Sequence, residues 1–234
     1  MNNNINTYIS DWDNIHCEQH VVNLVEQIYQ KIDAYYIDNG PICVVDIGAN
    51  VGKVYDLLSK KISLEQYHMI EPNIELYKYL IDKYKNNPNI KIYNNAVGLT
   101  SNIVYFDTSS MEYQIKNNST NLNFGLCKVS NSPTNQEIKS IKISQFFQDN
   151  PSLYEKPCFI KIDTENFDYQ ILSDLVTVVD LFNKKPIIEF ENNYFCDGHS
   201  LEWAQGIVDQ YVHKGYQKIE ITRYMGDGIL EPIL

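Results

Sequence analysis

A short apolar run that ends in an acid and a glycine turn most constrains how this chain can fold. Residues 42–45 are apolar and are typical of a strand at the centre of a parallel sheet. Asp46 follows, then a turn that contains Gly48 and Gly52, and then apolar residues at helical spacing. This order predicts the nucleotide-binding half of a doubly wound α/β fold. Such a turn lets the backbone approach a ligand, and the next helix offers unpaired N–H groups.

The same alternation of strand and helix continues along most of the chain. We expect further strands at residues 67–71, 90–93, 159–163 and 186–191. We expect helices at about residues 18–36, 74–84, 167–179 and 201–211. Asn73 and Ser200 can cap two of these helices. Residues 215–234 indicate two strands joined by a hairpin turn at 226–228. The order requires right-handed crossovers and therefore a mostly parallel sheet.

Residues 99–157 interrupt this alternation, because they contain no clear long helix. The segments expected here are strands at 103–106 and 138–143, a helical turn at 144–147, and loops at 117–123 and 130–136. We interpret residues 99–157 as an insertion that forms the acceptor site over one end of the sheet. The whole chain, residues 1–234, is then a single domain, with an N-terminal arm and helix at 1–40.

Composition limits the partners of the chain. The net charge of −11 at pH 7 argues against a general nucleic-acid or anionic-membrane surface, because such binding needs clustered positive charge. Five scattered cysteines without a CxxC motif indicate free thiols in a reducing compartment. No apolar run reaches the length of a membrane span. We therefore expect a cytoplasmic protein without a membrane partner.

Several motifs in order resemble the FkbM family of methyltransferases. The matching segments are D-I-G-A-N-V-G at 46–52, I-E-P-N at 70–73, N-A-V-G at 95–98 and I-K-I-D-T-E at 160–165. The chain departs from the family at Asn166, where the family usually has glycine. The resemblance implies a Rossmann-like class I methyltransferase fold. Its sheet has seven mostly parallel strands and an antiparallel C-terminal hairpin, and its cofactor is S-adenosylmethionine.

The expected cofactor site collects residues from three strand ends: Asp46, Gly48, Ala49, Asn50 and Gly52, then Glu71 and Pro72, then Asn95, Ala96 and Val97. An acid about 20 residues beyond the glycine turn is suited to accept hydrogen bonds from both ribose hydroxyls, which favours that role for Glu71. The resemblance places the adenine pocket at the third strand end, although Ala96 and Val97 are equally suited to the core. The alternative role for Asp46 is to fix the turn.

The turn lacks the third glycine of G-x-G-x-x-G. A methyl donor carries no pyrophosphate that would need this cradle, so the pattern points away from a nicotinamide cofactor. A nicotinamide-dependent oxidoreductase remains an alternative function.

The expected catalytic residues are Asp163, at the carboxyl end of its strand, and Glu165 on the following turn. Glu165 is the preferred base, and its alternative role is a helix-terminal acid. Lys161 lies in a buried strand, where an unpaired charge is costly. We therefore predict an ion pair between Lys161 and Glu189 or Glu191, rather than a catalytic lysine.

Three oxygen-bearing side chains, those of Asp163, Glu191 and Asn192, have the chemistry that Mg²⁺ prefers. We nevertheless expect no metal here. By resemblance, the expected reaction is methylation of a hydroxyl oxygen on a sugar or another small molecule, with a small-molecule or glycan acceptor as the partner. The departure at Asn166 leaves a second hypothesis, a non-catalytic binding module of the same fold.

Overall fold

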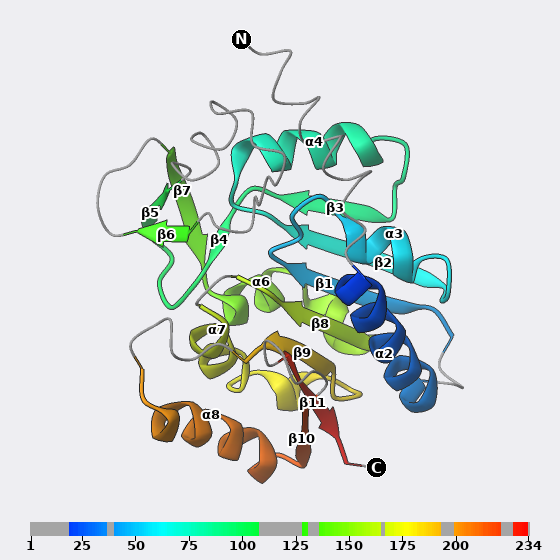
Figure 1. Ribbon diagram of the computed structural model, residues 1–234, viewed down its shortest axis with the longest axis vertical. Helices are drawn as coiled ribbons and strands as arrows, with labels where there is room; N and C mark the ends of the chain where they lie inside the picture. Colours follow the sequence, from blue (N-terminus) through cyan, green and yellow to red (C-terminus); the bar gives the residue numbers. More distant parts are fainter. Residues whose placement is uncertain are drawn as a thin grey trace.

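A seven-stranded sheet carries helices on both of its faces (Figure 1). The computed structural model describes residues 19–36, 40–107, 128–130, 136–164, 167–192, 199–220 and 227–233. The strands are β1 (Ile42–Ile47), β2 (Leu64–Ile70), β3 (Ile90–Tyr93), β8 (Cys158–Ile162), β9 (Ile187–Glu191), β10 (Tyr216–Glu220) and β11 (Asp227–Pro232). Their order across the sheet is β10-β11-β9-β8-β1-β2-β3.

Five strands of this sheet, from β9 to β3, pair in parallel, and β11 pairs antiparallel with both β9 and β10. This topology confirms the predicted class I methyltransferase fold. The predicted turn at 226–228 is wrong in position, because Asp227 and Gly228 already belong to β11. A Cβ on Gly228 would lie 2.7 Å from the ring of Phe190, so glycine here makes room for that ring. Residue 226 lies outside the described part of the chain.

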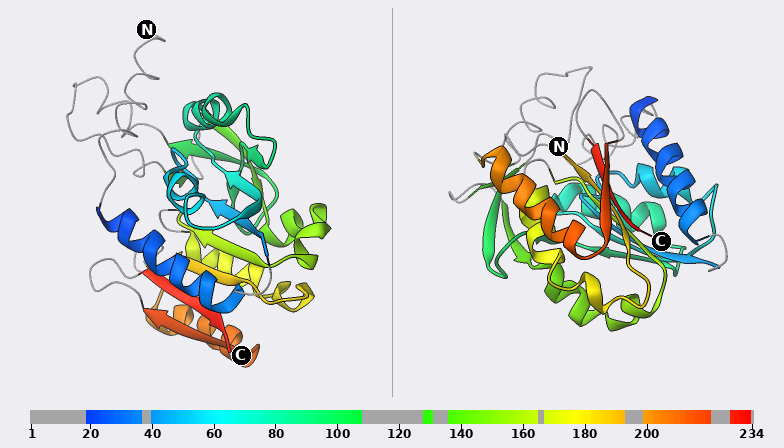
Figure 2. Two further views of the ribbon diagram at one scale, coloured as in Figure 1. Left: turned by 90° about the vertical axis from the view of Figure 1, so that its right-hand side faces the viewer. Right: turned by 90° about the horizontal axis from the view of Figure 1, so that it is seen from below.

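Strand alternation divides the core into two layers. The helices α2 (Gln19–Tyr36), α3 (Lys53–Leu58) and α4 (Ile74–Tyr84) pack on the face that carries Val44. The helices α6 (Ile143–Asp149), α7 (Asp168–Leu175) and α8 (Leu201–His213) pack on the face that carries Val45. Figure 2 shows α2 and α7 on opposite sides of the sheet. Because helices cover both faces, β1 is buried along its whole length.

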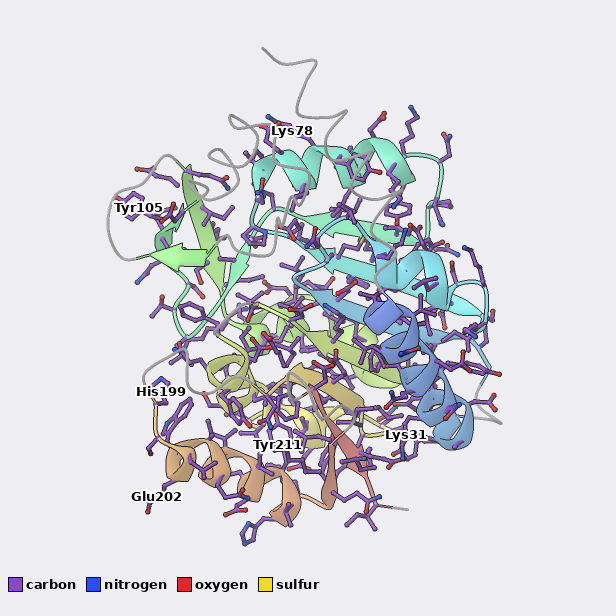
Figure 3. All side chains as sticks on the ribbon, in the orientation of Figure 1. Lys31, Lys78, Tyr105, His199, Glu202 and Tyr211 are labelled. Atoms are coloured by element: carbon purple, nitrogen blue, oxygen red, sulfur yellow. The ribbon has the colours of Figure 1, made fainter. Side chains whose placement is uncertain are left out.

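Local chemistry explains where the helices begin and which side they bury. The side chain of Asn73 accepts hydrogen bonds from Glu75 N and Leu76 N, and Ser200 Oγ accepts one from Trp203 N. Both predicted caps are therefore confirmed. Along α8, Tyr211 points inward and Glu202 points to solvent (Figure 3).

The interruption, together with the two residues just before Gly98, forms a second, smaller sheet, which lies beside the main sheet at the left of Figure 1. Its strands are β4 (Ala96–Val97), β7 (Gln136–Ile141), β5 (Ile103–Asp107) and β6 (Lys128–Ser130), in that order. The prediction of a strand over 138–143 is shifted, because β7 begins at Gln136 and Ile143 already opens α6. The 3-10 helices Pro151–Glu155 and Val179–Leu181 complete the elements of the described ranges.

Two described cysteines, Cys43 and Cys158, are buried free thiols. Across the ranges that the structure covers, no helix has both the length and the apolar character needed to cross a bilayer. The first part of the predicted N-terminal arm, residues 1–18, lies outside these ranges.

Candidate cofactor and catalytic site

The carboxyl ends of β2, β1 and β8 bring the predicted site residues to one edge of the sheet. The turn after β1 is bonded on both sides: Gly48 N donates to Ile70 O at 2.9 Å, and Asp163 N donates to Ile47 O at 3.0 Å. The strand ends that carry Glu71 and Asp163 therefore flank the glycine turn. In a parallel α/β sheet this edge is where ligands bind.

Gly48 is required by the packing of the chain against itself. Its φ is +79°, in the left-handed region, and a Cβ there would collide with the carbonyl oxygen of Asp163. The backbone that closely approaches this glycine is thus the end of β8. Gly48 holds the β1 turn and Asp163 together.

Gly52 is constrained from the side of α4. Its φ is +78°, and a Cβ would collide with the hydroxyl of Tyr84. That hydroxyl lies 3.0 Å from Gly52 O and 2.8 Å from Asp56 Oδ1. Lys83 Nζ donates to Val51 O at 2.9 Å and to Asp56 Oδ2 at 2.7 Å. Side chains of α4 therefore fix the turn at the N-terminus of α3.

Glu71 is a buried acid whose carboxylate accepts hydrogen bonds from two backbone N–H groups. It is 4% exposed, its Oε2 accepts from Asn50 N at 2.8 Å, and its Oε1 accepts from Asn73 N at 2.8 Å. Burial raises the pKa of Glu71 to about 7, against the lowering effect of the two N–H groups. A carboxylate has about four acceptor sites, so each oxygen can accept one further hydrogen bond. That capacity matches two adjacent hydroxyls.

Asn50 adds a second polar group at the same place. Its backbone adopts the left-handed conformation with φ 51°, and its Oδ1 is buried without a hydrogen-bond partner among the described residues. A buried acceptor of this kind calls for a donor. The side chain of Asn50 and the remaining acceptor sites of Glu71 therefore fit a ligand that carries hydroxyl or amino donors, as S-adenosylmethionine does.

The third strand end is divided between the site and the core. Asn94 Nδ2 donates to Glu71 O at 2.9 Å and to Pro72 O at 3.0 Å, a support that the sequence did not predict. Asn95 is half-buried and bonds to the second sheet. Ala96 and Val97 are buried in β4, and Val97 belongs to the hydrophobic core, as the alternative prediction had it.

Asp46 lies inside the protein. It is 0% exposed, its Oδ2 accepts from the hydroxyl of Tyr67 at 2.8 Å, and its Oδ1 lies 3.4 Å from Lys161 Nζ. Its carboxylate therefore faces an amino group of the chain itself. This arrangement ties β1 to β2 and β8 directly below the glycine turn.

Lys161 has different partners from those predicted. Its Nζ lies 3.1 Å from Asp163 Oδ2 and 3.4 Å from Asp46 Oδ1, so the predicted ion pair with Glu189 or Glu191 is wrong. In the register of the sheet, Lys161 lies between Asp46 on β1 and Glu189 on β9, so both acids are its neighbours on adjacent strands. Burial alone would lower the pKa of Lys161, but the nearby acids Asp163, Asp46 and Glu189 raise it above its ordinary value. The charge is thus held inside the sheet.

Glu189 completes this buried row on the other side of Lys161. It is 1% exposed, and its Oε2 has no hydrogen-bond partner among the described residues. Burial raises the pKa of Glu189 well above its usual range, although Lys161 opposes this. Glu189 is thus a buried acid beside Lys161 in the register of the sheet.

Asp163 is the accessible end of the same row. Its side chain is 46% exposed, whereas those of Lys161 and Asp46 are 4% and 0% exposed. Of these three side chains, Asp163 is the one placed to meet a ligand. The other predicted base, Glu165, and its neighbour Asn166 lie outside the described residues.

Asp168 joins the ends of β8 and β9, a role that was not predicted from the sequence. Its Oδ2 accepts from Thr164 Oγ1 at 2.8 Å, and its Oδ1 accepts from Glu191 N at 3.1 Å. Burial raises the pKa of Asp168 well above its usual range, and the charge of Asp163 adds to this effect. The signal was an acid in the first turn of the helix after Asp163.

Two of the three side chains considered for Mg²⁺, those of Asp163 and Asn192, have other partners in this structure. Asn192 Oδ1 accepts from the hydroxyl of Tyr169 and lies 3.4 Å from Lys218 Nζ. Over the described residues, His, Cys, Asp and Glu side chains form no group of three or more that could hold a metal ion.

Known proteins share features with this chain. The sequence pattern of the family described as the Methyltransferase FkbM domain matches residues 46–213, more than half of the chain. No curated protein sequence shows significant similarity.

Among solved structures, monomeric WbdD shares 10% identity at a TM-score of 0.51, over 96% of this chain and 45% of that chain, so this chain spans less than half of WbdD. The magnesium protoporphyrin IX methyltransferase (ChlM) from Synechocystis PCC 6803 with bound SAM shares 10% identity at a TM-score of 0.46, over 89% and 77%. The precorrin-6y C5,15-methyltransferase from Geobacter metallireducens GS-15 shares 12% identity at a TM-score of 0.44, over 87% and 86%. At these identities the likeness concerns the fold alone.

Proposed function

The chain belongs to the FkbM family of methyltransferases, and we propose that it transfers a methyl group from S-adenosylmethionine to a hydroxyl oxygen of a sugar or another small molecule. The observation that carries the choice of a hydroxyl acceptor is the half-exposed carboxylate of Asp163 beside the glycine turn. A carboxylate in that place is suited to remove the proton of a hydroxyl.

The residues around the turn divide the task of holding the cofactor. Glu71 would accept hydrogen bonds from the two ribose hydroxyls through the acceptor sites that its backbone partners leave. Asn50 Oδ1 would accept a hydrogen bond from a further donor of the same ligand. When bound, S-adenosylmethionine supplies an electrophilic methyl group on a sulfonium centre. Because this donor is already reactive, placing the two substrates supplies much of the rate.

Asp163 then acts as the base. Lys161 Nζ holds Asp163 Oδ2 at 3.1 Å and orients the carboxylate at the end of β8. The carboxylate takes the proton of the hydroxyl as the oxygen attacks, which prevents positive charge from building up on that oxygen. Glu165 is the second candidate for this role. Asp168 and Thr164 support the backbone between the two acids.

The acceptor site belongs to the second sheet in this proposal. Its strands β5, β6 and β7 come from the segment that interrupts the strand–helix alternation, and its strand β4 continues directly from Asn94 and Asn95 at the cofactor edge. Segments over the carboxyl ends of a parallel sheet commonly carry specificity. A small-molecule or glycan acceptor would bind between this sheet and Asp163.

Calorimetric titration tests the cofactor first. The wild-type chain should bind S-adenosylhomocysteine and should not bind NAD. Transfer of labelled methyl from S-adenosylmethionine to a panel of sugars and small hydroxyl compounds then tests the reaction. Absence of binding to S-adenosylhomocysteine would exclude the methyltransferase proposal, and protection by NAD would favour an oxidoreductase. Binding without transfer on a broad panel would favour a non-catalytic module.

Two single variants separate the candidate bases. We expect Asp163→Asn to keep its affinity for S-adenosylhomocysteine and to lose transfer by roughly 10²- to 10⁴-fold, the usual contribution of a general base. Glu165→Gln is the matched variant. Intact transfer by Asp163→Asn together with a loss in Glu165→Gln would assign the base to Glu165.

A further inference from the structure

Four of the predicted cofactor residues contact one strand of the second sheet; they are Pro72, Asn95, Ala96 and Val97. Ala96 and Val97 pair with β7 as β4, and Asn95 Nδ2 donates to the carbonyl of Lys139 at 3.1 Å. The strand β7 therefore contacts both the cofactor edge of the main sheet and the other strands of the second sheet.

Gln136, the first residue of β7, makes the contact nearest to Glu71. Its Nε2 donates to Pro72 O at 2.6 Å, and its Oε1 accepts from Ile74 N at 3.4 Å. Pro72 directly follows Glu71, and Ile74 is the first residue of α4. Both ends of one amide side chain therefore bind the short segment that connects Glu71 to its helix. The sequence had placed Gln136 at the end of a loop.

This segment is held from three directions. Glu71 binds Asn73 N from within the segment, Asn94 binds Glu71 O and Pro72 O from the end of β3, and Gln136 binds from the second sheet. Of these three contacts, the one from Gln136 comes from outside the main sheet. The segment that carries Glu71 is therefore tied to β7 as well as to the main sheet.

We propose that Gln136 is a positioning residue, which links the order of the second sheet to the binding of S-adenosylmethionine at Glu71. Binding that fixes residues 71–73 also fixes the partner of Gln136, and an ordered β7 presents Glu71 in its binding position. Such coupling is reciprocal. Cofactor binding at Glu71 favours the ordered state of β7, and the ordered state of β7 increases the affinity for the cofactor by the corresponding factor. The inference rests on the proposed role of Glu71 in cofactor binding.

Titration of the full chain with S-adenosylhomocysteine tests the first half of the linkage. Gln136→Met keeps the size of the side chain and removes both hydrogen bonds, so the Kd should rise roughly five- to tenfold. Gln136→Glu keeps an acceptor for Ile74 N but cannot donate to Pro72 O, and it should weaken binding as well. Glu137→Gln, on the exposed next position of β7, is the control and should change the Kd less than twofold.

Hydrogen exchange tests the second half. In the wild-type chain, S-adenosylhomocysteine should slow exchange in β7 and β5, for example at Ser140 N, which donates to Asn102 O at 2.8 Å. In Gln136→Met at saturating ligand, the slowing should persist at Asn50 N and Asn73 N and be lost in β7. Circular dichroism establishes that each variant is folded.

The outcomes separate this inference from the proposed function. If the wild-type chain binds no S-adenosylhomocysteine, the proposed function fails and the inference fails with it. If the wild-type chain binds and the Gln136 variants bind equally well, even with a lower melting temperature, Gln136 is merely structural and the inference alone is overturned. Equal slowing of exchange in β7 of Gln136→Met would overturn it too.

Discussion

At the scale of single residues, Glu71 is a buried acid that accepts two hydrogen bonds and has a raised pKa. Its two oxygens accept the N–H groups of Asn50 and Asn73, and it is almost fully buried. A ribose-binding role alone would predict that Glu71→Ala weakens cofactor binding with little effect on stability. The structure changes this expectation, because truncation would leave two buried N–H groups without acceptors, at about 1–3 kcal/mol each.

Stability should depend on pH through Glu71. The pKa of Glu71 is about 7 in the folded chain and 4.5 ordinarily. Its contribution to the free energy of unfolding is therefore complete below pH 4.5 and is lost as the pH rises through 7. The difference corresponds to roughly 3 kcal/mol of unfolding free energy. Denaturant unfolding between pH 4.5 and 7.5 should show this loss in the wild-type chain and not in Glu71→Gln. The partly exposed Glu75→Gln is the control, and a loss that persists in Glu71→Gln would contradict the assignment.

Cofactor binding should release protons from the same group. Hydroxyl donors favour the ionised carboxylate, so binding should lower the pKa of Glu71 from about 7. Near pH 7 we expect a release of up to about half a proton per S-adenosylhomocysteine bound, and an affinity that increases from pH 5.5 to 7.5. Calorimetry in buffers of different ionisation enthalpy measures this number. Proton uptake, or no exchange at all, would argue against contact with Glu71.

Lys161 should be important for stability because its partner Asp46 has no access to water. Replacing Lys161 by Met leaves that charge buried, which should cost about 3–5 kcal/mol of unfolding free energy. Combined with Asp46→Asn, the loss should be smaller than the sum of the two single losses by about 1 kcal/mol or more. Lys61→Met, which removes an exposed pair with Glu26, should cost less than about 1 kcal/mol. Additive losses at Lys161 and Asp46 would show that the two groups do not interact.

At the scale of elements, the glycine turn is a joint between β1 and β8. Gly48→Ala would drive a Cβ into the carbonyl of Asp163 at a positive φ, so the strand ends must separate. We expect a loss of more than about 2 kcal/mol and much weaker binding of S-adenosylhomocysteine. Gly206→Ala in the exposed face of α8 meets no atom within 4 Å and should instead stabilise by roughly 0.5–1 kcal/mol. Thermal and denaturant unfolding of both variants compare the two glycines directly. A Gly48→Ala chain as stable as wild type would show that Gly48 is not needed to hold the β1 turn against the end of β8.

Elements were predicted well where their signals are local. The helix at 74–84 and the strand at 90–93 were predicted at the bounds that the structure shows. The helix has its own cap at Asn73, and both segments carry their apolar residues at the spacing of the element that they form. The second sheet was predicted only as two short strands. Its pairing of β4 with β7 joins segments far apart in the chain, and nothing in either segment specifies the other.

At the scale of the whole molecule, the proposed cofactor should stabilise the fold. A ligand that binds only the native state adds about 2.7 kcal/mol at 100 times its Kd. For a chain of this length that corresponds to a rise in melting temperature of roughly 5–10 °C. Differential scanning fluorimetry with S-adenosylhomocysteine should show the rise, and NAD at the same concentration is the control. A rise with NAD alone would favour the oxidoreductase alternative.

The candidate site was partly predictable for a physical reason. Acids at the ends of buried strands are visible in the sequence, and the parallel topology brings Glu71 and Asp163 to one edge. Which groups these acids and their neighbours contact depends on register and side-chain rotamers. Lys161 had buried acids on both sides, and only the folded geometry pairs it with Asp46 and Asp163 rather than Glu189.

By itself the sequence determined the order of strands and helices, the glycine turn and the family, because periodicity, caps and motifs act over a few neighbouring residues. Tertiary structure alone decided that Asp46 is enclosed with Tyr67 and Lys161, that Gly48 is needed by the backbone of Asp163, and that Gln136 reaches Pro72. These contacts join residues far apart in the chain. Their energies depend on sheet register and packing, which no local pattern records.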